Sequence, residues 1–200
     1  MALVYLVRHG ETDWNRSGQI MGTRPIPLNE RGRAQARKLG MLMEGVKIGR
    51  IVTSPVARAV QTAEILQETL RAPLHHDPGL AEVSVGDWEG KFWDDLVDDD
   101  ARTNFYRRPD VTRPPGGETL QEVQARAVSA LTRALGPETV PVLLVSHADV
   151  IRTLLAHCLG LALDQVRYMR IAHTTLSALA LHDTSADLLY LNYPSELSGH

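Results

Sequence analysis

Cysteine is almost absent from this chain of 200 residues, which has only Cys158. One cysteine cannot form an internal disulfide, so we expect a cytoplasmic protein, although a disulfide-free exported protein would have the same composition. Long apolar runs are also missing, and none approaches the roughly 20 residues of a membrane-spanning helix. The apolar start of the chain is cut by Arg8 and His9, which excludes the core of a signal peptide.

Excess charge of one sign is missing as well. The 21 basic and 24 acidic residues leave a net charge of −3, so we expect neither nucleic acid nor a membrane as a partner. Hydrophobic residues make up 44% of the chain and charged residues 22%, the balance of an ordinary globular protein. The length suits one domain over 1–200, with no repeat or linker.

Strand-like and helix-like segments alternate along the chain. The expected strands are 2–7, 50–53, 80–83, 141–145, 168–172, 176–182 and 188–193. The expected helices are 29–44 with Asn29 as N-cap, one opened by Ser54 and Pro55, 119–135 opened by the capping box of Thr119 and Glu122, and 150–159. This alternation predicts an α/β fold, a three-layer α/β/α sandwich with a mostly parallel central sheet.

Polar side chains follow several of the expected strands directly. Arg8 and His9 end the first strand, and His147 follows the apolar segment 141–145. Arg58 lies in the first turn of the helix after 50–53, and Glu82 lies in the short segment 80–83. Because ligands bind at the carboxyl ends of strands in open α/β sheets, we expect these five residues to meet at one edge.

The chemistry of this set fits the transfer of a phosphoryl group. Arginines and helix N-termini hold a phosphate dianion, an imidazole can attack phosphorus, and a carboxylic acid can protonate the leaving alkoxide. The reaction needs no metal ion, and we expect no metal site and no cofactor. Other interpretations exist for single residues: Arg8 and His9 could form a surface turn, and Glu89, Asp87 and Glu118 compete with Glu82 as the acid.

Several motifs make the sequence resemble the histidine phosphatase superfamily, the phosphoglycerate mutase-like proteins. They are "LVRHGETDWN", "PLNERGRAQARKLG", "SPVARAVQTAEIL", "LAEVSVGDWEG", "PPGGETLQEV" and "SHADVIRTLL", in the family's order and over nearly the whole chain. The resemblance implies that His9 is the phosphorylated nucleophile and Glu82 the proton donor. It also implies phosphate contacts from the remaining candidates: Arg8, Arg58, His147, Asn15 and the backbone amide of Ala148.

Two departures from the family pattern affect the expected site. The residues after His147 are usually glycines, whereas this chain has Ala148 and Asp149, and Asp149 could repel a phosphate or orient His147. The phosphatases of the family often carry a glutamine before Gly22, where this chain has Met21. We keep Gly22 and the following residue, Thr23, as candidates for substrate binding.

The segment 86–117 is expected to cover the active site and to set specificity. The adjacent Arg107 and Arg108 could bind a carboxylate or a second phosphate of the substrate, or they could be surface charges. Trp88 is expected at the rim of the pocket because it follows Glu82 closely in the sequence.

Three functions agree with the sequence. The first is a metal-independent phosphomonoesterase of the histidine acid phosphatase type, acting on a small phosphorylated metabolite. The second is a cofactor-dependent phosphoglycerate mutase, and the third is a non-catalytic protein that binds a phosphorylated ligand. The interval between Glu82 and His147 is short compared with that of the mutases this chain resembles, which favours the phosphatase. The sequence is also compatible with a homodimer.

Overall fold

A six-stranded mixed sheet forms the centre of the protein. The computed structural model describes residues 1–136 and 140–194. The strands are β1 (Ala2–Arg8), β2 (Arg50–Thr53), β3 (Leu74–His76), β4 (Val142–Ser146), β5 (Leu176–Leu181) and β6 (Ala186–Tyr193). Their order is β3-β2-β4-β1-β5-β6. The first four are parallel, whereas β5 and β6 pair antiparallel, so the predicted mostly parallel sheet is confirmed.

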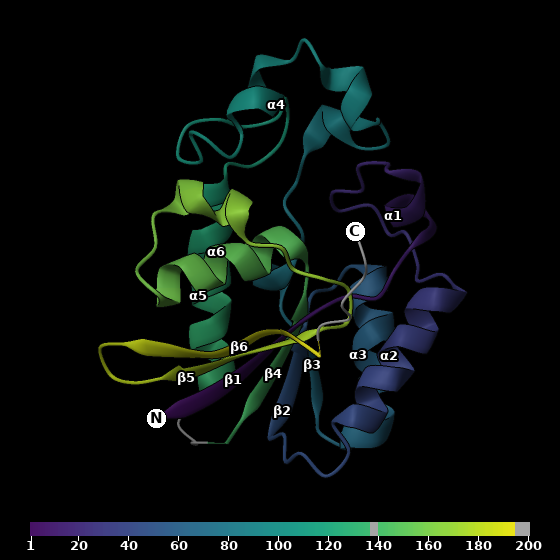
Figure 1. Cartoon of the computed structure of the whole chain (residues 1–200), viewed down its shortest axis with the longest axis vertical. Coiled ribbons are helices and arrows are strands. Elements are labelled where there is room, and N and C mark those ends of the chain that lie inside the picture. The colour runs from purple at the N-terminus through teal and green to yellow at the C-terminus, as the bar shows by residue number, and fades with distance from the viewer. Residues whose placement is uncertain (137–139, 195–200) are drawn as a thin grey trace.

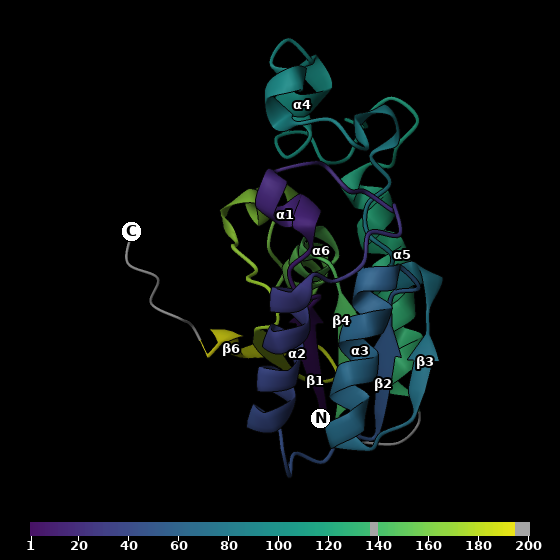
Figure 2. The ribbon, with the colours of Figure 1, turned by 90° about the vertical axis from the view of Figure 1, so that its right-hand side faces the viewer.

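Helices cover both faces of this sheet. These helices are α2 (Glu30–Leu42), α3 (Ala57–Leu70), α5 (Leu120–Leu135) and α6 (Ala148–Cys158), and the two short helices α1 (Asp13–Ser17) and α4 (Asp100–Asn104) lie beyond the sheet. The pair α2 and α3 packs on one face, and α5 and α6 pack on the other (Figures 1 and 2). The three-layer α/β/α architecture is therefore confirmed. Within the described residues, no helix is long and apolar enough to span a membrane.

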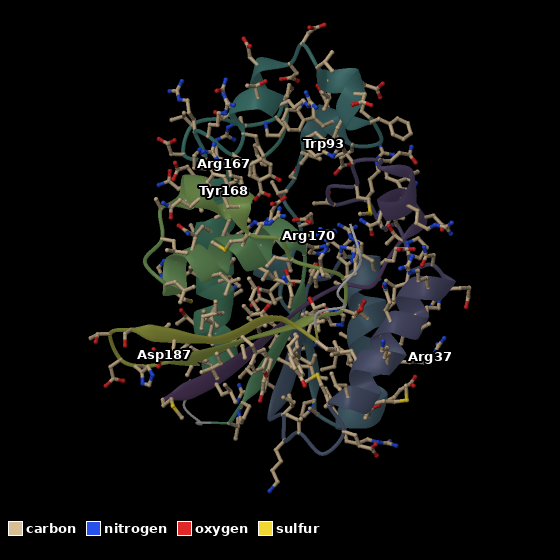
Figure 3. The ribbon with its side chains drawn as sticks, in the orientation of Figure 1. Arg37, Trp93, Arg167, Tyr168, Arg170 and Asp187 are labelled. Carbon is tan, nitrogen blue, oxygen red and sulfur yellow. The ribbon has the colours of Figure 1, made fainter. Side chains whose placement is uncertain are left out.

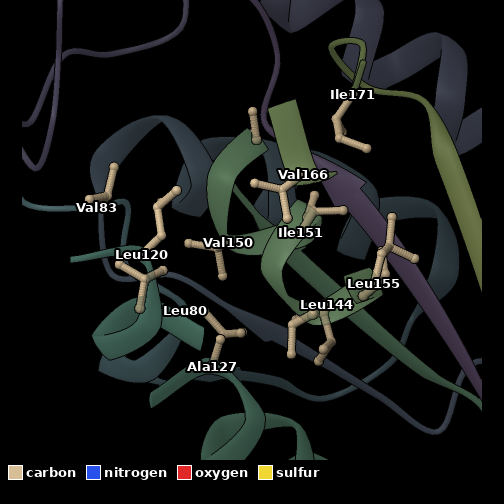
Figure 4. Packing of buried hydrophobic residues seen from close by; sticks show 14 of the residues in the cluster. Leu80, Val83, Leu120, Ala127, Leu144, Val150, Ile151, Leu155, Val166 and Ile171 are labelled. Carbon is tan, nitrogen blue, oxygen red and sulfur yellow. The ribbon is translucent and has the colours of Figure 1, made fainter. Parts of the chain in front are cut away.

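The central strands β1 and β4 are covered on both faces of the sheet, which explains their continuous apolar sequences. Successive side chains of a strand point to opposite faces. Leu6 and Leu144 pack against α5 and α6, whereas Val7 and Val145 pack against α2 and α3. Figure 4 shows the first of these clusters, in which Leu144, Ile151 and Leu155 meet. Apolar side chains of β1 and β4 therefore pack into one of the two cores at almost every position.

Local capping chemistry fixes where two of the helices begin. The Asn29 side chain accepts a hydrogen bond from the Gly32 amide at the start of α2. Thr119 and Glu122 form the predicted reciprocal capping box at the start of α5. Both helices therefore begin where the sequence predicts.

Ser54 does not cap α3, so that prediction was wrong. The helix begins at Ala57, with Val56 as an N-cap that makes no side-chain bond. The Ser54 hydroxyl instead accepts the Val56 amide at 3.2 Å and lies 2.8 Å from Nε2 of His147. The Ser54 hydroxyl therefore contacts His147 at the end of β2 instead of capping α3.

Two expected strands are also wrong, and one was missed. Residues 78–80 form a 3₁₀ turn, Pro78–Leu80, and the strand at this edge is the preceding β3. A second 3₁₀ helix, Leu163–Tyr168, stands where the strand 168–172 was expected to begin. The helix expected at 150–159 begins earlier, at Ala148.

The segment 86–117 projects beyond the sheet. It contains the 3₁₀ turns Gly86–Trp88 and Trp93–Leu96 and the short helix α4, and it lies at the top of Figure 1. Trp88 is buried inside it, with its indole N–H donating to Asp99 at 2.8 Å. Trp88 packs against Trp93 and Phe105, so its expected place at a pocket rim is wrong.

A close backbone approach joins the end of β1 to the start of α2. A Cβ added to Gly32 would lie 2.1 Å from the Glu11 carbonyl oxygen, and one added to Gly10 would lie 2.5 Å from the Gly32 carbonyl oxygen. Both distances are far inside van der Waals contact. The loop after His9 can therefore rest on α2 only because both positions are glycine.

Gly32→Ala should destabilise the protein by about 1–3 kcal/mol, because a methyl group there must displace backbone rather than a side chain. The free energy of unfolding in urea measures this. Gly40→Ala is the matched control in the same helix, since its Cβ would meet side chains rather than backbone, Thr69 at 3.1 Å and Leu66 at 3.8 Å. Equal effects of the two substitutions would show that the contact with the His9 loop is unimportant.

Candidate active site

The pairing of β1 with β4 brings two histidines together. Arg8 is paired with Ser146 in the parallel register, and the His9 amide donates to the Ser146 carbonyl at 2.9 Å. The next residue on each strand is a histidine, and the rings of His9 and His147 lie 5.1 Å apart. Both side chains are buried. The predicted meeting of strand ends therefore places two imidazoles at one point.

The neighbours of His9 determine its tautomer. Nδ1 lies 2.7 Å from the Gly10 carbonyl oxygen, which can only accept, so Nδ1 carries the proton. The Nε of Arg58 donates to Nε2 of His9 at 3.1 Å, so Nε2 presents a lone pair. Burial, followed by the positive charge of Arg58, lowers the His9 pKa well below its usual value. His9 is therefore a neutral imidazole with a nucleophilic Nε2.

Two arginines surround this nitrogen, and main-chain carbonyls hold both. Nη1 of Arg58 donates to the Arg24 carbonyl at 3.0 Å, and Nη2 donates to the Gly22 carbonyl at 2.8 Å. Nη1 of Arg8 donates to the Ile171 carbonyl at 2.7 Å, whereas its buried Nε has no partner among the described residues. Burial lowers the pKa of each to about 10, so both remain charged at neutral pH and suit an anion.

His147 is held by Ser54 and keeps one nitrogen free. Its Nε2 lies 2.8 Å from the Ser54 hydroxyl, while Nδ1 is buried without a hydrogen-bond partner among the described residues. Burial and the charges of Arg58 and Arg8 lower the His147 pKa well below its usual value. A buried polar atom without a partner is costly, so Nδ1 is available for a ligand.

Glu82 is the carboxylate that reaches the histidines. Its Oε2 lies 3.9 Å from Nδ1 of His147, and burial, followed by the charge of Asp149, raises its pKa to about 7. The competing carboxylates are occupied or remote. Glu118 pairs with Arg126, Glu89 accepts from the 22–24 loop, and Asp87 is exposed.

The remaining candidates lie around this centre in different ways. Ala148 begins α6, where first-turn amides have no helical acceptor. The Gly22 carbonyl holds Arg58, and the hydroxyl and amide of Thr23 both donate to Glu89. The side-chain oxygen Oδ1 of Asn15 accepts a hydrogen bond from the Thr12 amide in the capping box of α1. Contact of these residues with a substrate stays a prediction.

The arginine pair of the 86–117 segment lies apart from His9. Arg107 and Arg108 are both exposed. Arg107 lines a hollow of about 660 Å³ together with residues of its own segment and of 164–168, namely Thr103, Tyr106, Asp164, Arg167 and Tyr168. Figure 3 shows Arg167 and Tyr168 beneath the 86–117 segment. No residue of the histidine cluster lines this hollow.

The sequence analysis missed a third histidine in the cluster. The His173 ring lies 5.4 Å from the His9 ring, and its Nδ1 is 3.1 Å from the His9 carbonyl oxygen. Burial and the charge of Arg8 lower the pKa of His173 to about 3. No motif marks this residue, because it follows a segment that was misread as a strand and pairs with His9 only through the tertiary fold.

Metal ligands are not grouped in the parts of the chain that the structure describes. No set of three or more histidine, cysteine, aspartate or glutamate side chains there could hold a metal ion. The acidic residues of 94–100 instead include caps of short helices. Asp99, for example, accepts two amides at the start of α4.

Comparisons with known proteins agree on one family. A profile of the histidine phosphatase superfamily (branch 1) matches residues 4–194. The chain is 34% identical over 182 residues to "Probable phosphoglycerate mutase GpmB" of Enterobacter sp. (strain 638), covering 90% of this chain and 85% of that one. It is 30% identical to the alpha-ribazole phosphatase from Shigella flexneri, with a TM-score of 0.85, over 95% of this chain and 96% of that one. It is 26% identical to mycobacterial glucosyl-3-phosphoglycerate phosphatase complexed with VO3, with a TM-score of 0.88, over 96% of this chain and 99% of that one.

The raised pKa of Glu82 predicts a pH-dependent gain in stability for Glu82→Gln. The folded protein keeps a proton on Glu82 between its usual pKa of 4.5 and about 7, so wild-type stability falls as pH rises through this window. The variant lacks this loss and should be the more stable protein above pH 7, by up to about 3 kcal/mol. Urea unfolding of both proteins at pH 4 and pH 8 measures the difference. An equal difference at both pH values would contradict the raised pKa.

Proposed function

The chain belongs to the histidine phosphatase superfamily (branch 1), and we propose that it is a phosphomonoesterase that forms a phosphohistidine on His9 and needs no metal ion. Its substrate is a small phosphate ester. The observation that carries this proposal is the fixed tautomer of His9. The Gly10 carbonyl holds Nδ1–H, so the Nε2 lone pair lies among two arginines and a second histidine.

In the first step, Nε2 of His9 attacks the phosphorus of the ester. An N–P bond forms as the P–O bond to the alcohol breaks, and Glu82 gives its proton to the leaving oxygen. A pKa of about 7 keeps a substantial part of Glu82 protonated at neutral pH. The neutral state of His9 supplies the lone pair that the attack requires.

In the second step, water hydrolyses the phosphohistidine. The Glu82 carboxylate takes a proton from the water as its oxygen attacks phosphorus. The N–P bond breaks, and inorganic phosphate leaves. Glu82 and His9 return to their starting states, so the cycle consumes one water molecule and no cofactor.

The charged and polar groups around His9 stabilise the transferring phosphoryl group. The guanidinium groups of Arg8 and Arg58 and the unpartnered Nδ1 of His147 would contact the equatorial oxygens. The first amide of α6, at Ala148, adds the positive end of a helix dipole. These donors are fixed before the substrate arrives, so they need no reorganisation during the reaction.

Phosphoglycerate mutase is the second candidate function, because the curated relative GpmB carries that name. A mutase must protect its phosphohistidine from water and hold a second acidic group of the substrate. The exposed Arg107 lines a hollow that no residue of the histidine cluster shares. This arrangement favours hydrolysis over retention of the phosphoryl group.

His9→Ala should reduce phosphate release by at least about 10³-fold, because it removes the nucleophile. A phosphorylated substrate labelled with ³²P should leave acid-labile, base-stable label on His9 in quenched wild-type protein. His182→Ala is the matched control, since His182 is an exposed imidazole paired with Asp187, and it should keep wild-type activity. Label on a serine or an aspartate would contradict the mechanism.

The products distinguish the phosphatase from the mutase. With 3-phosphoglycerate and a panel of phosphate monoesters, we expect inorganic phosphate as the main product and no activation by 2,3-bisphosphoglycerate. Rates should be unchanged after exhaustive treatment with EDTA, because arginines occupy the place of cations. Stoichiometric formation of 2-phosphoglycerate with little phosphate release would identify a mutase.

A further inference from the structure

Thr62 is a fully buried threonine of α3 that lies one turn after Arg58. Its hydroxyl donates to the Arg58 carbonyl at 2.7 Å and accepts the Gly10 amide at 3.0 Å. A hydroxyl carries one proton, so the bond to Arg58 leaves a lone pair that faces Gly10. Among the described residues, this hydroxyl is the only acceptor of the buried Gly10 amide. Thr62 thus joins α3 to the loop after β1, and the mechanism proposed above assigns it no role.

The two bonds of Thr62 complete a closed ring of hydrogen bonds around His9. Nε of Arg58 donates to Nε2 of His9 at 3.1 Å, and Nδ1 of His9 donates to the Gly10 carbonyl at 2.7 Å. The Gly10 amide then donates to Thr62, and Thr62 donates to the Arg58 carbonyl. All four bonds run in one direction, so each residue of the ring both donates and accepts. Bonds in such a connected buried network strengthen one another.

The imidazole of His9 is therefore held by groups from two separate elements. Arg58 comes from α3, and the Gly10 carbonyl comes from the loop after β1. Thr62 hydrogen bonds directly to the backbone of both Arg58 and Gly10. If α3 and the loop shift relative to each other, Nδ1 and Nε2 of His9 cannot keep both of their partners. The orientation of the nucleophile thus depends on a link that makes no hydrogen bond to its ring.

The peptide unit between His9 and Gly10 has one further partner. Its carbonyl, that of His9, accepts from Nδ1 of His173 at 3.1 Å, and its N–H is the one that donates to Thr62. The unit is held at both ends, so loss of either bond leaves it free to turn about the other. Loss of the Thr62 hydroxyl would also leave a buried amide without an acceptor, which favours movement of Gly10 toward a new partner. The Gly10 carbonyl, on the same residue, would then leave Nδ1 of His9.

We propose that Thr62 is a positioning residue that fixes the orientation of the His9 imidazole by tying the loop after β1 to the turn of α3 that carries Arg58. The proposal rests on the phosphatase function proposed above, in which Nε2 of His9 attacks phosphorus. Such an attack depends on alignment, and a displacement of about 1 Å can cost roughly 100-fold in rate. A purely local role within α3 would account for the bond to Arg58 but not for the bond from Gly10, 52 positions away in the sequence.

The first test follows the Nδ1 proton of His9 by ¹⁵N NMR, which needs no substrate. Its signal is the imidazole resonance that is lost in His9→Ala. In the wild type this proton should exchange slowly with water, because the ring is buried and Nδ1 bonds to Gly10. Thr62→Val keeps the shape of the side chain but removes both hydrogen bonds of the hydroxyl, so it should speed this exchange at least about tenfold. Thr62→Ser keeps the hydroxyl and should restore slow exchange.

The second test measures kcat and KM with 2-glycerophosphate and p-nitrophenyl phosphate. Thr62→Val should lower kcat by about 10- to 100-fold. KM should change less than about threefold, because Arg8 and His147, the proposed phosphate contacts, lie outside the ring. Thr62→Ser should recover kcat. Thr153→Val is the matched control, since Thr153 is also buried and its hydroxyl donates to Val150 within its own helix, and it should leave kcat and the exchange of the imidazole proton at their wild-type values.

A folded Thr62→Val that keeps wild-type exchange of the Nδ1 proton, or wild-type kcat, would make Thr62 a structural residue and overturn the proposal. Should this variant fail to fold, amide exchange in the wild type decides. The Gly10 amide should exchange as slowly as the Ser54 amide, which donates to the Val145 carbonyl at 3.0 Å, and fast exchange of the Gly10 amide would also overturn the proposal. Failure of the wild type to release phosphate from either ester would instead contradict the proposed function.

Discussion

The register between β1 and β4 is the constraint on which the whole site depends. Arg8 is paired with Ser146, and one backbone hydrogen bond continues this pairing from His9 to Ser146. A slip of one residue would turn every side chain of β1 to the opposite face of the sheet. It would exchange Leu6 and Val7 between the two cores and separate His9 from His147. The apolar residues that make the strand buried are thus the same ones that align the two histidines.

Burial of the cluster also determines its protonation. His9, His147 and His173 all have lowered pKa values because they are buried near two guanidinium groups, whereas burial and Asp149 raise the pKa of Glu82. One environment therefore keeps the His9 imidazole neutral and part of Glu82 protonated at the same pH. These surroundings separate the protonation states that the proposed nucleophile and acid require.

Much of this arrangement could be predicted from the sequence, and the failures have physical reasons. The strands β1, β2 and β4 could be predicted because they carry apolar residues on both faces. The starts of α2 and α5 could be predicted because Asn29 and Thr119 follow local capping rules. His9, His147 and Arg58 could be placed together because parallel strand ends meet at one edge, whereas Glu82 reaches them from the loop after the turn Pro78–Leu80 rather than from the expected strand. The place of His173 in the cluster could not be predicted, because its contact with the His9 carbonyl oxygen depends on the course of the turn before β5. The bond of Ser54 to His147 joins residues 93 positions apart, and a local capping rule cannot find such a bond.

The acceptors that hold the central side chains are mostly main-chain carbonyls. Gly10 holds His9, Ile171 holds Arg8, and the carbonyls of Gly22 and Arg24 hold Arg58. A carbonyl oxygen survives the replacement of its own side chain, provided that the backbone keeps its course. Residues such as Ile171 and Arg24 can therefore change during evolution while the nucleophile and its arginines stay in place. The cluster can thus keep its geometry while the side chains around it differ, which agrees with a family whose members carry the names of different enzymes.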